Sequence, residues 1–492
     1  MARRSGSRPR LRSRVPLVTV LMFAAASASA QVQTKEYDNG GVYEGGFLDG
    51  RQHGEGTYRL PNGYEYTGEW VEGRIEGEGR ATFPNGAIYE GSFRDGHPDG
   101  HGRITYPDGG AYEGSWQAGS IEGEGVATYA NDMRYEGSFA AGQQHGQGRL
   151  TGPDGYVYDG AWVNGVKEGI GRITYPDGAT YEGDMVAGVP EGRGVLTAAD
   201  GLRYEGAWKA GQIEGEGGLD QPEGERYEGS FIAGRRDGLG RATAPNGDVY
   251  TGGFQAALRH GAGTLTGADG FSYTGDWVEG RIEGEGRASY PDGSVYEGGF
   301  RDGRPHGEGK ITYSGGASYE GGWADGAMAG TGTARYADGT IYEGSFADGR
   351  NHGEGRLTTL DGYSYEGGWQ DGLRQGEGVA VYPDGTRYEG GFAEGLRAGT
   401  GTMTMTGGYV FEGTWKDGLL EGPGRATYGN GDVYEGEFRA GQRQGPGRML
   451  FSTGQAFEGE WREGQPLNEG EAELPAPVEA PTGPGEPAPT ND

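Results

Sequence analysis

One spacing dominates this sequence: an aromatic residue, mostly followed by Glu-Gly, returns every 23 residues without an insertion. If that aromatic is numbered as position 1, glycine fills positions 3 and 14 of every repeat. Self-similarity at a fixed short period is the signature of a repeat architecture, so the 109 glycines serve a regular geometry. The nineteen residues at position 1 are Tyr43, Tyr66, Tyr89, Tyr112, Tyr135, Tyr158, Tyr181, Tyr204, Tyr227, Tyr250, Tyr273, Tyr296, Tyr319, Tyr342, Tyr365, Tyr388, Phe411, Tyr434 and Phe457.

The pattern inside each repeat predicts two strands. Positions 1 and 5 are aromatic, whereas position 2 is mostly Glu and position 4 is small or polar, and such alternation with a period of two is typical of a β-strand. Glycine at position 8 and a Pro-Asn-Gly or Pro-Asp-Gly link mark the turns. The sequence therefore predicts an all-β fold, an elongated single-layer antiparallel β-meander in which each repeat is one β-hairpin.

The expected register brings glycines together. With a hairpin loop at positions 7–10 and a link at positions 19–21, position 1 lies opposite position 16, and position 3 lies opposite position 14. The facing glycines leave a bare backbone floor that a ring from position 5 can cover.

Position 5 alternates between Phe and Trp and holds all nine tryptophans, so the larger duplication unit has 46 residues. The alternation slips once, where Phe254 follows Phe231, and Ala257 replaces the position 8 glycine in the same repeat. We expect a joint between two blocks of repeats near residues 250–260.

The motif Tyr-Glu-Gly-x-Trp/Phe-x-x-Gly-x-x-x-Gly-x-Gly, seen for example at residues 342–355, resembles the MORN repeat. The resemblance covers residues 43 to about 470. It implies a twisted single-layer β-sheet that acts as a spacer, scaffold or docking surface, sometimes at membranes. Plant phosphatidylinositol phosphate kinases and junctophilins carry such repeats, but repeats alone imply no kinase activity.

Twelve repeat aromatics are the residues that we single out as structural. We expect these rings to pack against one another or to face a second copy, and the alternative is an exposed platform for sugars or lipid tails. Exposed apolar surface on a long sheet marks an interaction site. These residues are Tyr43, Phe47, Tyr66, Trp70, Tyr112, Trp116, Tyr273, Trp277, Tyr319, Trp323, Tyr365 and Trp369.

The rows of polar side chains at positions 2, 11 and 15 do not indicate a catalytic or metal-binding site. Position 11 carries histidine in five repeats and acids in others, but neighbours in this row are about 10 Å apart, too far to share a metal ion. Glu at position 2 and Arg or Lys at position 15 are expected to be cross-strand neighbours that form weak ion pairs, each about 0.2–1 kcal/mol. Identical repeats give their carboxylates identical environments, so we predict no catalytic residue, no metal site, no cofactor and no enzyme activity.

The two ends of the chain differ from the repeats. In residues 1–30, arginines precede an apolar run and a small-residue cleavage site at 28–30, which predicts an export signal. Residues 31–42 form a leader, residues 43–465 the nineteen repeats, and residues 466–492 a tail rich in Pro and Glu that we expect to be disordered. The protein is therefore expected to be periplasmic or extracellular.

Composition narrows the class of partner. A formal net charge of −31 disfavours nucleic acid as a ligand, and the absence of cysteine excludes a disulfide framework. We expect a non-catalytic scaffold or protein-interaction rod in the cell envelope or extracellular space, which binds a protein partner or itself. The alternative is a module that binds envelope glycan or membrane lipid through its aromatic face.

Overall fold

The computed structural model describes residues 32–467. Within this range the chain forms 39 strands and no helix, which confirms the predicted all-β class. No candidate membrane-spanning helix occurs in the same range. The export signal at residues 1–30 and the tail beyond residue 467 lie outside the described residues. Pro466, the first residue of the expected tail, lies in the short strand β39 (Gln465–Pro466).

The chain divides into two compact units. Within the described residues, unit 1 comprises residues 32–178 and 184–189, and unit 2 comprises residues 179–183 and 190–467.

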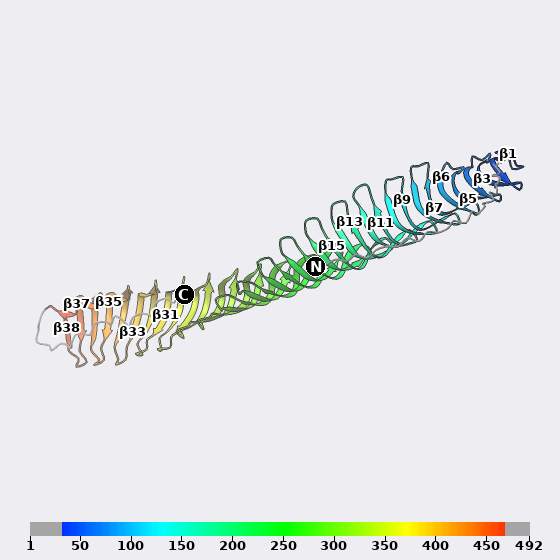
Figure 1. Ribbon diagram of the computed structural model, residues 1–492. Coiled ribbons are helices and arrows are strands. Elements are labelled where there is room, and N and C mark those ends of the chain that lie inside the picture. Colours follow the sequence, from blue (N-terminus) through cyan, green and yellow to red (C-terminus); the bar gives the residue numbers. More distant parts are fainter. Residues whose placement is uncertain (1–31, 468–492) are drawn as a thin grey trace, which may run out of the picture. The chain divides into compact units, whose positions relative to one another are not determined.

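The strands of unit 1 pair antiparallel in chain order from β1 to β13 (Figure 1). Their bounds are β1 Gln33–Glu36, β2 Val42–Leu48, β3 Arg51–Arg59, β4 Glu65–Val71, β5 Arg74–Thr82, β6 Ile88–Arg94, β7 His97–Thr105, β8 Ala111–Gln117, β9 Ser120–Thr128, β10 Arg134–Ala140, β11 Gln143–Thr151, β12 Val157–Val163 and β13 Val166–Thr174, and β14 Thr180–Val186 is divided between the units.

The strands of unit 2 pair in the same way from β15 to β39. Their bounds are β15 Val189–Thr197, β16 Arg203–Lys209, β17 Gln212–Asp220, β18 Arg226–Ile232, β19 Arg235–Thr243, β20 Val249–Gln255, β21 Leu258–Thr266, β22 Ser272–Val278, β23 Arg281–Ser289, β24 Val295–Arg301, β25 Arg304–Thr312, β26 Ser318–Ala324, β27 Ala327–Arg335, β28 Ile341–Ala347, β29 Arg350–Thr358, β30 Ser364–Gln370, β31 Leu373–Val381, β32 Arg387–Ala393, β33 Leu396–Thr404, β34 Val410–Lys416, β35 Leu419–Thr427, β36 Val433–Arg439, β37 Gln442–Leu450, β38 Ala456–Arg462 and β39.

The register inside each hairpin is the predicted one. In the first repeat, Tyr43 pairs with Tyr58 and Gly45 pairs with Gly56. These are the expected pairs of position 1 with position 16 and of position 3 with position 14. Tyr58 also pairs with Tyr66 of the next repeat, so position 16 lies between two successive position 1 residues. The prediction of an antiparallel meander of hairpins is confirmed.

The hairpin loop is shorter than we expected. Leu48 pairs with Arg51, so only positions 7 and 8 form the turn, and Asp49 (φ 48°) and Gly50 (φ 75°) both have positive φ, as a type I′ turn requires. The prediction of a loop at positions 7–10 was wrong because the second strand contains a bulge. The register shifts between Gly45 and Phe47, and Gly54 at position 12 supplies the left-handed residue of the bulge with a φ of 73°.

The link between repeats is the predicted three-residue connection. Leu60 N–H donates to the Tyr64 carbonyl at 2.8 Å, and Gly63 N–H donates to the Leu60 carbonyl at 3.1 Å. The Asn62 side-chain oxygen accepts a hydrogen bond from Tyr64 N–H at 3.0 Å. Asn or Asp before glycine is therefore favoured here because its side chain closes the turn.

The tyrosine at position 1, rather than the ring at position 5, covers the glycine floor. A Cβ atom on Gly45 would lie 2.5 Å from Tyr43 Oη, and one on Gly56 would lie 2.3 Å from it. The hydroxyl continues past both glycines and donates to the Gly46 carbonyl at 3.0 Å. Our expectation about position 5 was wrong for the tyrosine repeats because it overlooked this long reach along the strand, which requires glycine at both floor positions. The expectation holds over Gly424, where Phe411 replaces the tyrosine and an added Cβ atom would meet the Phe438 ring.

Rings at position 5 pack edge-to-face against the tyrosines at position 1. Tyr43 lies 5.2 Å from Phe47 of its own repeat and 5.1 Å from Trp70 of the next, measured between ring centroids. The Trp70 indole N–H also donates to the Gly56 carbonyl at 3.3 Å. Edge-to-face pairs contribute about 0.5–1.5 kcal/mol beyond area burial. A single sheet layer can thus bury its own aromatic face without a covering helix.

The repeat where the Phe/Trp alternation slips keeps the common register. Tyr250 pairs with Leu265 and Gly252 with Gly263, as in other repeats. Ala257 takes the left-handed conformation of the glycines that it replaces, with a φ of 73°. The expected joint near residues 250–260 stays a prediction. The two compact units divide at residues 178–190, where Met185 takes the place of the position 5 ring.

Candidate binding groove

The twelve repeat aromatics singled out from the sequence lie in the packed layer. All are buried except Phe47, which is half-buried. The nine tryptophans of the chain are only 1–8% exposed. Their faces are therefore covered by neighbouring side chains and offer little open surface to a ligand, which directs attention to the grooves beside them.

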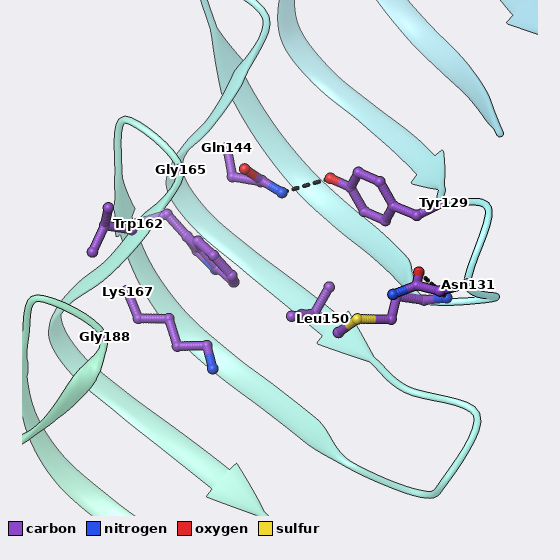
Figure 2. Close-up of a pocket in the computed structure, with 10 residues that line it drawn as sticks. Tyr129, Asn131, Gln144, Leu150, Trp162, Gly165, Lys167 and Gly188 are labelled. Atoms are coloured by element: carbon purple, nitrogen blue, oxygen red, sulfur yellow. Dashed lines mark hydrogen bonds between the residues drawn. The ribbon is translucent and has the colours of Figure 1, made fainter. Parts of the chain in front are cut away.

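A groove of about 450 Å³ opens beside Trp162 in unit 1 (Figure 2). Tyr129 and Asn131 from a link form one wall, and Leu150 lies between them and Trp162. Gln144 Nε2 donates to Tyr129 Oη at 2.5 Å. The complete lining is Tyr129, Asn131, Met133, Gln144, Leu150, Trp162, Gly165, Val166, Lys167 and Gly188.

A second groove in unit 1, of about 560 Å³, lies beside Trp116. Phe83, Ile104 and Trp116 in this groove precede Tyr129, Leu150 and Trp162 by 46 residues each. Both grooves therefore join the larger aliphatic side chain of a Phe repeat to the tryptophan of the following repeat. The 46-residue alternation in the sequence is also the period of these grooves, which we call the Trp116 groove and the Trp162 groove.

The chemistry of the two linings is apolar with a few polar groups. Neither lining contains an Asp or Glu, although the chain as a whole is strongly acidic. Lys167 in the Trp162 groove contacts the Tyr156 hydroxyl and lies 5.1 Å from the Tyr158 ring centroid. Burial lowers the pKa of this amine. Such a lining suits an apolar ligand that is neutral or carries negative charge.

In four of the six Phe repeats of unit 2 the corresponding place is occupied by arginine, whereas Pro305 and Asn351 stand there in the other two. Arg397, at the repeat position of Pro98 and Gln144, is 3% exposed and lies 5.1 Å from the Trp415 ring centroid. It donates to Tyr382 Oη at 3.2 Å and to the Gly418 carbonyl at 2.8 Å. Arg443 lies in the same way over Trp461, at 4.3 Å. Sequence reasoning missed this difference, although the change from Pro or Gln to Arg at position 10 could have indicated it.

The polar face carries ion pairs between the predicted positions, but the pairs of Arg80 and Arg287 join neighbouring repeats rather than the two strands of one hairpin. Arg80 pairs with Glu90 at 3.1 Å and Arg287 with Glu297 at 2.7 Å, in each case from position 15 to position 2 of the next repeat. Their side chains are mostly exposed, so each pair contributes little to stability.

The row at position 11 has a structural role that we did not predict. Glu76 Oε1 accepts a hydrogen bond from Asp95 N–H at 3.1 Å, so the side chain holds the hairpin turn of the next repeat. Glu122 does the same for Ala141 N–H at 2.8 Å. The acceptor at position 11 precedes the turn residue at position 7 of the next repeat by 19 residues, and this constant spacing in the sequence could have indicated the contact. Among residues 32–467, no group of three or more acids and histidines is arranged to hold a metal ion.

The fold and the repeated floor define a class of protein, an open sheet built from β-hairpin repeats. The MORN repeat family matches nineteen consecutive segments, from residues 43–63 to residues 457–471. The chain belongs to the MORN repeat family. These repeats are a non-catalytic type that serves in interactions with proteins or membranes.

No curated protein sequence matches this chain. Among solved structures, the SAS-4 TCP domain of Drosophila melanogaster in complex with a proline-rich motif of Ana2 is 14% identical, covers 44% of this chain and 99% of its own, and has a TM-score of 0.21. The TCP10 domain of Danio rerio CPAP with a STIL peptide is 12% identical, covers 56% and 97%, and has a TM-score of 0.14. A streptogramin B lyase is 12% identical, covers 61% and 92%, and has a TM-score of 0.11. With TM-scores this low, these similarities carry no argument about function.

Proposed function

We propose that this protein is a non-catalytic scaffold of the cell envelope or extracellular space that binds protein partners along the aromatic side of its sheet. The observation that carries the proposal is the repeated groove. The Trp116 and Trp162 grooves present the same apolar walls at a fixed interval, with no carboxylate in either lining. Repeated pockets for side chains suit an extended polypeptide, because successive residues can enter successive pockets.

The envelope location is supported by sequence alone. Arginines followed by an apolar run and Ala28-Ser29-Ala30 form the pattern of an export signal. A protease-protection assay on fractionated cells tests this part. A chain that stays in the cytoplasmic fraction with residues 1–30 still attached would contradict it.

Crosslinking in intact cells, followed by capture of the chain, tests partner binding. We expect one or more stoichiometric protein partners, and their recovery should fall when Tyr106 and Tyr129 are both replaced by Ser. The control is Val163→Ser, because Val163 is similarly exposed in unit 1 but lies outside both groove linings. Failure to recover any stoichiometric partner with the unmodified chain would count against the proposal.

Binding to envelope glycan or a lipid surface is the second candidate. It is favoured by the link tyrosines Tyr106, Tyr129 and Tyr313, which are 36–40% exposed and could stack on sugar rings or enter a headgroup layer. Co-sedimentation with purified cell-wall polysaccharide and with liposomes distinguishes these ligands. If the chain binds neither, this candidate is removed.

A further inference from the structure

The grooves of unit 1 have a period that a polypeptide can match. The Trp116 and Trp162 grooves are related by 46 residues, which is four strands, so they are about 19 Å apart along the sheet at about 4.8 Å per strand. A polyproline II helix rises about 3.1 Å per residue and has three residues per turn. Six residues therefore advance about 19 Å and return a side chain to the same side.

The carboxyl-terminal sequence of this chain has the same six-residue interval. Prolines at 475, 481 and 487 begin three successive hexads, Pro-Ala-Pro-Val-Glu-Ala, Pro-Thr-Gly-Pro-Gly-Glu and Pro-Ala-Pro-Thr-Asn-Asp. Residues 468–492 contain several acids and no Lys, Arg or His. Proline-rich segments dock into grooves lined by aromatic side chains because they lose little conformational entropy on binding.

The groove linings complement this sequence. Tyr129, which is 36% exposed, provides an aromatic wall, and Val166, which is 44% exposed, provides an aliphatic contact for a proline ring, whereas the buried Trp162 and Leu150 form the floor of the groove. Lys167 provides a cation beside the groove, and neither lining holds a carboxylate that would repel the acidic hexads. The hydrogen bond between Gln144 and Tyr129 recurs two 46-residue periods earlier, where Gln52 Nε2 donates to Tyr37 Oη at 2.7 Å, but Tyr58 replaces the aliphatic residue there.

A tail cannot reach these grooves along its own sheet. From β16 to β38 the strands of unit 2 follow one another in order, a path on the order of 100 Å along the sheet at about 4.8 Å per strand. Residues 468–492 span at most about 90 Å when fully extended. We therefore assign the occupant to another molecule, and the concentration dependence of association distinguishes this from binding within one molecule.

We propose that residues 468–492 of a second copy of this chain bind in the Trp116 and Trp162 grooves of unit 1 as an extended proline-rich segment. Each molecule then both offers grooves and supplies a tail. This inference rests on the proposed function, because it names the polypeptide that a groove accepts.

Unit 2 supplies the variant that tests the proposal. Arg397 and Arg443 fill the corresponding place in unit 2 by lying over tryptophan, so arginine is compatible with the fold at this repeat position. The double substitution of Pro98→Arg with Gln144→Arg should therefore close both grooves of unit 1. Gln143→Arg is the matched control for the change at residue 144, because it adds the same single charge beside Gln144 but at an exposed residue outside the groove lining.

Sedimentation velocity of the purified chain over a range of concentrations should show self-association. The closing variant should associate about tenfold or more weakly, whereas Gln143→Arg should associate as the unmodified chain does. Thermal melting of the variants checks that they fold, and Gln144→Arg alone replaces the double variant if that one does not.

Fluorescence anisotropy with the chain kept dilute measures binding of a labelled peptide of residues 468–492. The same peptide with Pro475→Ala, Pro481→Ala and Pro487→Ala should bind about tenfold more weakly.

Three results would overturn the proposal: equal binding of the two peptides, equal association of the closing variant and Gln143→Arg, or a chain that stays monomeric although the peptide binds. If envelope proteins are still captured by crosslinking in any of these cases, the proposed function stands and only the tail as occupant is excluded.

Discussion

Ala257 offers a direct test of how the hairpin turn is built. In the other repeats, glycine at position 8 has a φ between 75° and 92°, and Ala257 is held at 73°. An L-residue in the left-handed region costs about 1–2 kcal/mol. Glycine removes this cost, but its greater conformational freedom also stabilises the unfolded chain by about 0.4–1 kcal/mol, which offsets part of the gain. We therefore expect Ala257→Gly to stabilise this hairpin by about 0.5–1 kcal/mol.

Native-state hydrogen exchange of β20 and β21 is the suitable assay, because a long repeat array does not unfold in one step. Exchange should slow roughly two- to fivefold in Ala257→Gly. The matched control is Gly280→Ala at the same position of the next repeat. A Cβ atom there would come no closer than 3.9 Å to Leu258, so only the backbone is perturbed. Exchange of β22 and β23, the strands of that hairpin, should accelerate by a similar factor. Unchanged or faster exchange in Ala257→Gly would refute the strain argument.

Three further predictions concern the floor, the turn support and the buried tyrosines. Gly286→Ala places a Cβ atom 2.4 Å from the Tyr273 ring and should destabilise its hairpin by about 2–3 kcal/mol, read by local hydrogen exchange; exchange as slow as in the unmodified chain would contradict this. Glu283 accepts a hydrogen bond from Asp302 N–H at 3.2 Å, so Glu283→Ala should cost about 1 kcal/mol in the same assay, whereas Glu283→Gln keeps an acceptor and should be nearly neutral. Burial raises the pKa of Tyr273 to about 12, above its unfolded value of about 10. The protonated phenol therefore stabilises the fold fully below pH 10, and this stability is lost as the pH rises from about 10 towards 12. An ultraviolet titration should show ionisation together with unfolding in that range, and tyrosines that all ionise near pH 10 in a folded chain would contradict the account.

Much of the fold could be predicted because glycine spacing restricts the register. Only a pairing of position 3 with position 14 brings the invariant glycines of a hairpin together, and the pairs Gly45 with Gly56 and Tyr43 with Tyr58 follow from it. The alternation of side chains along a strand also puts positions 2 and 15 on one face, but the ion pairs of Arg80 and Arg287 form across the link to the next repeat rather than within the predicted hairpin register. These features depend on neighbours in one or two strands, which a sequence displays directly.

The features that escaped prediction depend on backbone conformation or on long side chains. Gly54 at position 12 fits an alternating strand as well as it fits a bulge, and only the positive φ decides between them. Tyr43 crosses two glycines to reach the Gly46 carbonyl, a distance that spacing does not reveal. The grooves depend on the combined volumes of side chains from two neighbouring repeats, although their 46-residue period was visible in the sequence.

The central claim is that one sheet layer buries its own aromatic rings and leaves the Trp116 and Trp162 grooves beside them open to a partner. Acrylamide quenching of tryptophan fluorescence tests this claim, because all nine tryptophans are 1–8% exposed and all occupy position 5. The account predicts weak quenching and blue-shifted emission in the native chain, with strong quenching after unfolding in denaturant. Native quenching close to that of the unfolded chain would show that the rings form an open platform and would contradict the account.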